Sequence, residues 1–164
     1  MAQRSTAYAS RRAFVPESYS DQPSGPGTRA VIKLGKFLKV GQCYEQAERS
    51  FAFVRDLGFL GPERREHSIS FSSGDLVVEV AYDDRDGRVA TIVGAFFGER
   101  NPRAGLGCLY VNSGLEPQQD LKEIARSEQQ LTASLVSQAE AFRKVLPALS
   151  GPDGPALLLR CHGR

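Results

Sequence analysis

The chain has 164 residues, which fits one domain with a substantial core, and its apolar (41%) and charged (24%) fractions are ordinary for a globular protein. The longest apolar run, VATIVGAFF (Val89 to Phe97), is far below the roughly 20 residues that cross a bilayer, so we predict a soluble protein with no transmembrane segment. The net charge of +2 conceals a basic stretch at residues 1–40, where seven Lys or Arg face two Asp or Glu, and a mildly acidic remainder that argues against nucleic-acid binding.

Residues 1–40 are predicted to form a flexible basic leader before a single domain at residues 41–164. The first 30 residues lack a sustained period and contain the turn-forming run QPSGPG. The fragment SRRAFV resembles a twin-arginine export signal, but polar PESYSDQPSGPG follows it where such a signal has an apolar segment. We therefore expect a cytoplasmic protein. An organellar transit peptide stays an alternative, because the first 16 residues lack acids.

The leader ends in VIKLGKFLKV (residues 31–40), which spaces Lys33, Lys36 and Lys39 three residues apart. On a helix this spacing would give a basic amphipathic surface for an anionic membrane or a partner. Gly35 weakens such a helix, so the alternative is an ordinary segment that packs partly on the domain.

The domain begins with a predicted helix at about residues 43–57. CYEQAERSFAFVRDLGF places Tyr44, Ala47, Phe51 and Val54 on one face at steps of three and four. Gly58 is suited to end it.

Alternation of apolar and polar residues then predicts antiparallel strands in HSISFSS, LVVEVAYD and RVATIVGAFFG, with a fourth strand in GLGCLYVN (Gly105 to Asn112). Between the second and third strands, DDRDG is expected to be a hairpin turn, because Asp-Gly tolerates positive φ. A calcium loop is disfavoured, because Tyr82 and Val93 stand where that template has acidic ligands.

The last third is predicted to be helical. Pro117 can open one helix, which would carry Leu121, Ile124 and Ala125 on one face. A second helix is expected to begin at a capping box formed by Ser127 and Gln130, and Pro147 is expected to limit it. The final GPDGPALLLRCHGR fits either a short helix from about Pro155 or a strand.

These elements predict an α+β fold: a three- to four-stranded antiparallel meander with an N-terminal helix and C-terminal helices packed on one face. No catalytic, metal or cofactor motif is complete, so we predict no catalytic residue, no metal and no cofactor. Cys43, Cys108 and Cys161 are widely spaced and are expected to be reduced, idle thiols in a cytosolic protein. His67 is expected at the surface. Glu79 could form a catalytic carboxylate pair with Asp75 or Asp83, but the sequence pattern does not require these side chains to lie together.

The segment FFGERNPRAGLG is the candidate interaction site. Adjacent Phe96 and Phe97 face opposite ways in a strand, so one is expected in the core and the other exposed beside Arg100 and Arg103. An exposed aromatic residue beside arginines is typical of protein interfaces. The alternative is a surface loop whose phenylalanine is covered by the leader.

The order VRDLGF, HSISFSS and DLVVEVAYDDRDGRVATIVG, across about residues 43–96, looks like small bacterial proteins of unknown function, some of which resemble immunity proteins of polymorphic toxin systems. The resemblance implies a non-enzymatic protein that binds and blocks a toxin. The alternative is a small-ligand-binding protein or enzyme, with a site in the sheet–helix cleft built from scattered acids and Tyr82 or Tyr110.

Overall fold

The computed structural model describes residues 40–97, 99–115 and 121–163, and these belong to one compact unit, residues 34–164. The predicted leader and its basic segment lie outside the described residues, except for Val40. Among the described helices, none has both the length and the apolar composition that crossing a membrane requires.

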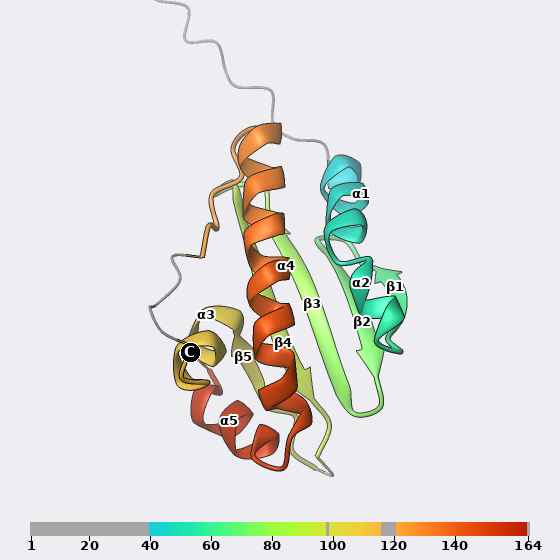
Figure 1. Cartoon of the computed structure of the whole chain (residues 1–164). Coiled ribbons are helices and arrows are strands. Elements are labelled where there is room, and N and C mark those ends of the chain that lie inside the picture. The colour runs from blue at the N-terminus through green and yellow to red at the C-terminus, as the bar shows by residue number, and fades with distance from the viewer. Residues whose placement is uncertain (1–39, 98, 116–120, 164) are drawn as a thin grey trace, which may run out of the picture. The chain divides into compact units, whose positions relative to one another are not determined.

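The described residues form five helices and five strands (Figure 1). In chain order they are α1 (Val40–Ser50), α2 (Phe53–Asp56), β1 (Leu60–Arg64), β2 (Ser68–Ser73), β3 (Leu76–Asp83), β4 (Arg88–Ala95), β5 (Arg103–Gly105), α3 (Leu106–Asn112), α4 (Glu128–Ser150) and α5 (Gly154–Cys161).

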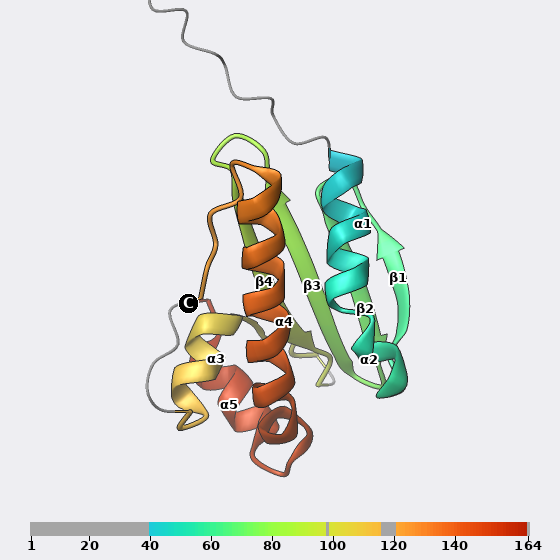
Figure 2. The same ribbon diagram turned by 45° about the horizontal axis from the view of Figure 1, so that its top comes forward.

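The strands form one antiparallel sheet in the order β1-β2-β3-β4-β5, so each strand pairs with the next one along the chain. The α+β meander predicted from the sequence is confirmed, with five strands in place of three to four. Both α1 and α4 run along one face of the sheet, side by side (Figure 2). α3 and α5 pack against α4 and against strands β4 and β5.

The helix-covered face of the sheet carries the core, because the apolar positions of the strands alternate onto it. One row across the sheet consists of Phe71, Val78, Val93 and Ala104, all of them buried. Phe142 of α4 packs onto this face among Phe51, Phe53 and Phe59, with ring centroids 6.3 to 6.5 Å apart. Such aromatic clusters supply much of the burial in a core of this size.

A buried polar contact joins α4 to the sheet. The Thr91 hydroxyl donates to Oε1 of Gln138 over 2.6 Å, and both side chains are almost fully buried. The Gln138 amide then donates to the carbonyl oxygens of Val89 and Lys122, at 2.9 and 3.0 Å. The buried Gln138 side chain is thus hydrogen-bonded at both its oxygen and its nitrogen, as buried polar groups require, and it joins α4 to two other segments.

The hairpin between β3 and β4 confirms the prediction for DDRDG. The Asp83 carboxylate accepts hydrogen bonds from the N–H groups of Arg85 and Asp86, which is the geometry of an Asx turn. Gly87 closes the turn with a φ of +60°, a conformation that glycine adopts without steric cost.

The fourth strand predicted at Gly105–Asn112 is wrong. The strand β5 ends at Gly105, and GLGCLYVN continues as helix α3 from Leu106. Leu106, Leu109 and Tyr110 are buried, and their spacing of three and four residues puts them on one face of a helix. A short apolar run fits a strand as well as a helix, and here the helical spacing was the informative signal.

The predicted helix at 43–57 is interrupted, because residues 51–52 form a turn between α1 and α2. The helix predicted from Pro117 is wrong in its described part, residues 121–126. There the chain is extended, and Val89 donates to the Glu123 carbonyl over 2.7 Å. Backbone hydrogen bonding to the start of β4 therefore determines the conformation of this segment, in place of the helix that the apolar spacing predicted.

The capping box is confirmed where the Ser127 hydroxyl accepts from the Gln130 N–H, while the Gln130 side chain accepts from Arg126. Pro147 does not end α4, which runs to Ser150. The tail forms helix α5, one of the two predicted alternatives. Gly154 lets it turn tightly from α4, because a Cβ there would lie 2.0 Å from the Leu149 carbonyl oxygen.

Candidate functional site

The face of the sheet opposite the helices is the candidate site, and its chemistry differs from that of the core. Its central positions are small or polar: the row from β2 to β5 reads Ser72, Val77, Gly94 and Arg103. The neighbouring row, from β1, reads Glu63, Ser70, Glu79 and Ile92. The short side chains of Ser70, Ser72 and Val77, together with Gly94, lie between longer ones and leave a hollow.

This hollow, which we call the open-face depression, has a volume of about 400 Å³. Its floor is built by strand residues of β2, β3 and β4, with Glu63 and Arg65 on one side and a β4–β5 wall on the other. The residues that line it are Glu63, Arg65, Ser70, Ser72, Val77, Glu79, Ile92, Gly94, Ala95, Phe96, Asn101, Pro102 and Arg103.

An ion pair crosses the floor of the depression. Arg103 extends from the edge strand β5 over Gly94 and donates to the Glu79 carboxylate on β3. A Cβ on Gly94 would lie 3.4 Å from Cγ of Arg103, so the arginine side chain passes in van der Waals range of this position. The carboxylate of Glu79 is well covered, while Arg103 remains more than half exposed. The guanidinium can therefore contact a bound molecule without leaving Glu79.

The candidate residues divide between two places. Phe96 is 55% exposed and lines the depression together with Arg103. Phe97 faces the other way and packs against the core, as expected for one of the two rings. Arg100 is exposed, and its backbone pairs with that of Phe97 in the loop. The structure thus brings Phe96 and Arg103 together, whereas Phe97 and Arg100 do not line this depression.

The sequence reasoning missed the β1 and β2 side of the site. No strand was predicted at LGPERRE, which holds Glu63 and Arg65 and contains a glycine and a proline, both unusual in strands. Ser70 and Ser72 alternate with the buried Ile69 and Phe71, so their common face could have been read from HSISFSS.

The depression offers binding groups, and the Glu79 carboxylate within it is already bound by Arg103. Neither of the chain's two histidines lines it: His67 is exposed beside Glu66, and His162 lies behind β5. Tyr82 and Tyr110, the tyrosines considered for an enzymatic site, are buried in the core, and burial raises the pKa of Tyr82. Within the described ranges, no three His, Cys, Asp or Glu residues are grouped to hold a metal.

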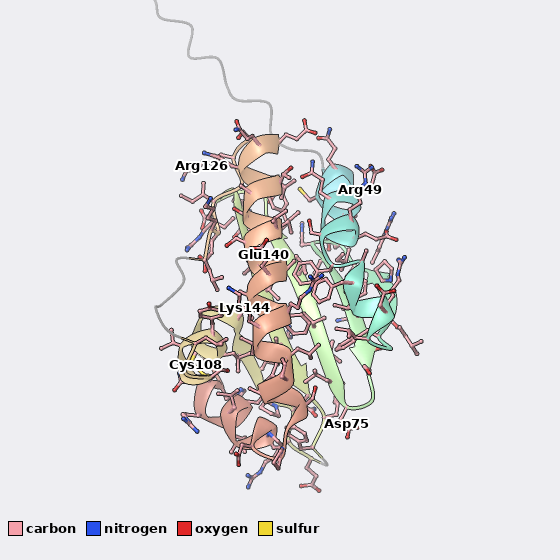
Figure 3. The ribbon with its side chains drawn as sticks, viewed as in Figure 1. Arg49, Asp75, Cys108, Arg126, Glu140 and Lys144 are labelled. Carbon is pink, nitrogen blue, oxygen red and sulfur yellow. A yellow bond between two sulfur atoms is a disulfide. The ribbon has the colours of Figure 1, made fainter. Side chains whose placement is uncertain are left out.

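A second cleft lies between the sheet and the helices. It measures about 530 Å³ and is mainly apolar, with Phe97 and Leu76 on the sheet side and Leu146 of α4 opposite. Its carboxylate comes from Asp75, which lies in the turn between β2 and β3 (Figure 3). Glu79 is on the other face of the sheet, so the carboxylate pair considered in the sequence does not form here.

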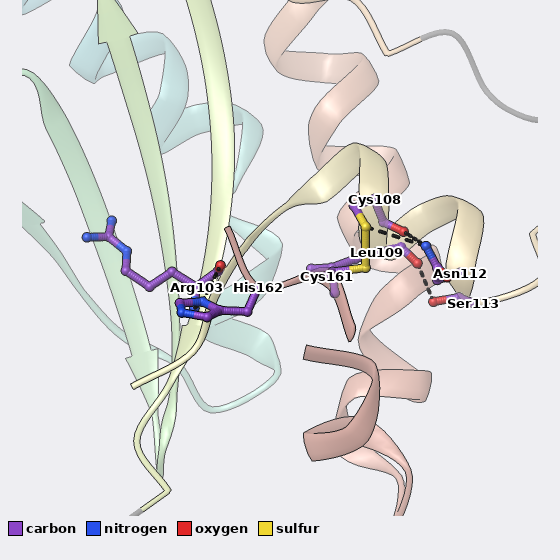
Figure 4. The surroundings of a disulfide bond; sticks show 7 residues. All are labelled: Arg103, Cys108, Leu109, Asn112, Ser113, Cys161 and His162. Atoms are coloured by element: carbon purple, nitrogen blue, oxygen red, sulfur yellow. Dashed lines mark hydrogen bonds between the residues drawn. A yellow bond between two sulfur atoms is a disulfide. The ribbon is translucent and has the colours of Figure 1, made fainter. Parts of the chain in front are cut away.

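The prediction of three idle thiols is wrong for two of them. Cys108 of α3 and Cys161 of α5 form a disulfide, with their Cα atoms 5.8 Å apart (Figure 4). Their separation of 53 residues hid this pairing from the sequence. Cys43 is a buried thiol, and burial raises its pKa to about 11, so it is protonated and unreactive at neutral pH.

Comparisons with protein-family models, with curated proteins and with solved structures found no match to this chain. Functional inference therefore depends on the geometry described above.

Proposed function

We propose that this chain is a non-enzymatic protein-binding module that receives a protruding loop of another protein in its open-face depression. The observation that carries the proposal is the pairing of exposed Phe96 with the partly exposed Arg103 on the wall of this hollow. Aromatic residues and arginine dominate the residues that contribute most to protein interfaces.

The openness and the chemistry of the depression favour a loop over a small metabolite. A volume of about 400 Å³ accommodates a few side chains, and the hollow is open to solvent along the sheet. Val77, Ile92 and Phe96 offer apolar contacts, while Glu63 and Arg65 offer charge of both signs at the opposite side. A loop with an apolar tip flanked by an acidic and a basic residue matches this pattern.

One form of this function is stoichiometric inhibition of a toxin in the cytoplasm, which the resemblance of residues 43–96 to immunity proteins implies. In that form the partner would be the toxin, and its protruding loop would carry residues needed for toxicity. The engagement of the Glu79 carboxylate by Arg103 supports binding over catalysis, because a paired carboxylate is a weaker general base.

Site-specific photo-crosslinking tests the proposal. The full chain, with a photoreactive phenylalanine analogue at position 96, is expressed in the source cells and irradiated, and adducts are identified by mass spectrometry. The same analogue at Val136, an exposed position on α4, is the matched control. We expect one protein adduct from position 96 and none from position 136. Arg103→Gln should reduce its yield at least about tenfold, as loss of a central interface residue does.

Equal adducts from both positions, or none from position 96 in a folded protein, would contradict the proposal. The second candidate function, small-ligand binding, is favoured by the apolar sheet–helix cleft beside Phe97. Leu76→Trp would fill that cleft from the sheet side. Loss of a retained small molecule in this variant, with crosslinking at position 96 absent, would favour the ligand-binding alternative.

A further inference from the structure

The C-terminal residues of the described chain hold the backbone of Arg103, the residue that reaches across the open-face depression. The Arg103 N–H donates to Nδ1 of His162 over 3.0 Å, and the Gly163 N–H donates to the Arg103 carbonyl over 3.2 Å. Residues 162–163 therefore pair both backbone groups of Arg103, the first residue of the edge strand β5. Arg103 is held by its backbone on one side and by Glu79 on the other.

The disulfide fixes these residues in place. Cys161 immediately precedes His162, and its bond to Cys108 ties the end of α5 to α3, which itself starts where β5 ends. Figure 4 shows the disulfide and the His162–Arg103 contact on the same side of the fold. An eight-residue helix is too short to be stable alone. Besides the disulfide, α5 is held by Leu157 and Leu158, which are buried.

We propose that the Cys108–Cys161 disulfide is a redox-sensitive clamp that regulates the open-face depression by holding Arg103 in place, an inference that rests on the proposed protein-binding function. In a reducing compartment such as the cytoplasm, disulfides are transient and serve regulation more often than structure. The oxidised chain presents a fixed Arg103 to its partner, and the reduced chain presents a mobile one.

The reduction proceeds by thiol–disulfide exchange with a dithiol. Cys161 is fully buried and Cys108 is half-buried, so the attacking thiolate reaches Cys108 Sγ. The bond to Cys161 breaks, and Cys161 leaves as a thiolate that takes up a proton. The second thiol of the reductant, as its thiolate, then attacks the reductant's own sulfur in the mixed disulfide and releases Cys108. Two electrons and two protons are transferred, and the reductant becomes a disulfide.

Hydrogen exchange on the full chain, before and after treatment with dithiothreitol, tests the clamp. We expect amide exchange in residues 103–105 and 154–161 to rise at least about tenfold on reduction, while exchange in β2 and β3 stays unchanged. Reoxidation with an oxidised dithiol should restore protection. The double variant Cys108→Ser/Cys161→Ser should exchange like the reduced protein in both conditions, and Cys43→Ser should respond like the wild type.

Photo-crosslinking from position 96 in both redox states tests the regulation. We expect the partner adduct to fall at least about tenfold on reduction. Unchanged exchange on reduction, or three free thiols after oxidation, would overturn the clamp. Increased exchange with an unchanged adduct would overturn the regulation and leave the proposed function intact. The absence of an adduct in both redox states would contradict the proposed function. The hydrogen-exchange result alone would then show whether the disulfide holds Arg103 in place.

Discussion

The two faces of the sheet use the same strands for opposite purposes. On the covered face, Phe71, Val78 and Val93 form an apolar row beneath the helices. On the open face, one residue away along each strand, Ser72, Val77 and Gly94 form a row of small side chains. Successive side chains of each strand point to opposite faces of the sheet, which separates the two rows. A one-residue change of register would exchange them.

The open face differs from a core that lacks its cover. A sheet face prepared for a second helix layer would carry large aliphatic residues throughout. Here the row of Ser72, Val77 and Gly94 is kept short, and longer side chains flank it, among them Glu63, Glu79, Phe96 and Arg103. The hollow that this leaves is large enough for a few side chains of another molecule.

The largest expected contrast is between two phenylalanines. Phe142→Ala removes a fully buried ring from the aromatic cluster and should lower the free energy of unfolding by about 3–5 kcal/mol. Phe96→Ala removes a mostly exposed ring and should change it by less than about 0.5 kcal/mol. Urea denaturation of both variants measures the difference. Similar losses would mean that Phe96 is part of the core.

A smaller contrast separates polar residues on the two faces. Thr91→Val leaves the buried Gln138 carbonyl without its donor, so it should cost about 1–3 kcal/mol of unfolding free energy. Ser72→Ala on the open face should cost less than about 0.5 kcal/mol. The same denaturation experiment applies, and a Thr91→Val variant as stable as the wild type would show that the buried contact contributes nothing net.

The smallest effect is expected at the charged border of the covered face. Glu48 accepts hydrogen bonds from Arg55, at 2.6 Å, and from Arg64 of β1, at 3.0 Å. The Arg55 contact in particular lowers the pKa of the Glu48 carboxyl. Glu48→Gln should therefore cost about 0.5 kcal/mol at pH 7, because such partly exposed pairs stabilise weakly.

The pH dependence of that cost has a definite sign. Because the pKa of Glu48 is lowered in the folded state, its contribution is complete above the unfolded carboxyl pKa of about 4.3. It is lost as the pH falls through the lower folded value. The difference in unfolding free energy between the wild type and Glu48→Gln should thus vanish in acid. A difference that persists there would mean that Glu48 acts through packing.

Much of the fold could be predicted because its strongest signals are local. Alternation identified β2, β3 and β4, and the capping box of Ser127 and Gln130 identified the start of α4. β1 was missed because a glycine and a proline interrupt it, and α3 because a short apolar run fits two structures. Tertiary context decided both elements.

The site was predictable only in part, because it is assembled across all five strands. Phe96 and Arg103 were found because a single loop brings an aromatic residue near an arginine. Glu63 and Glu79, which line the same depression, come from elsewhere in the chain, and only the pairing register places them on this face. The disulfide depends in the same way on the packing of α3 against α5, which no local spacing records.

Because each strand pairs with the next one along the chain, residue order in the sequence follows position across the open face. The row Leu60, Ser72, Val77, Gly94 and Arg103 crosses the sheet in the same order in which these residues occur in the chain. Substitution effects on binding, plotted against residue number at these positions, therefore trace a cross-section of the contact surface. The positions that contact a partner should form one continuous interval along that plot, so binding measurements alone would identify them.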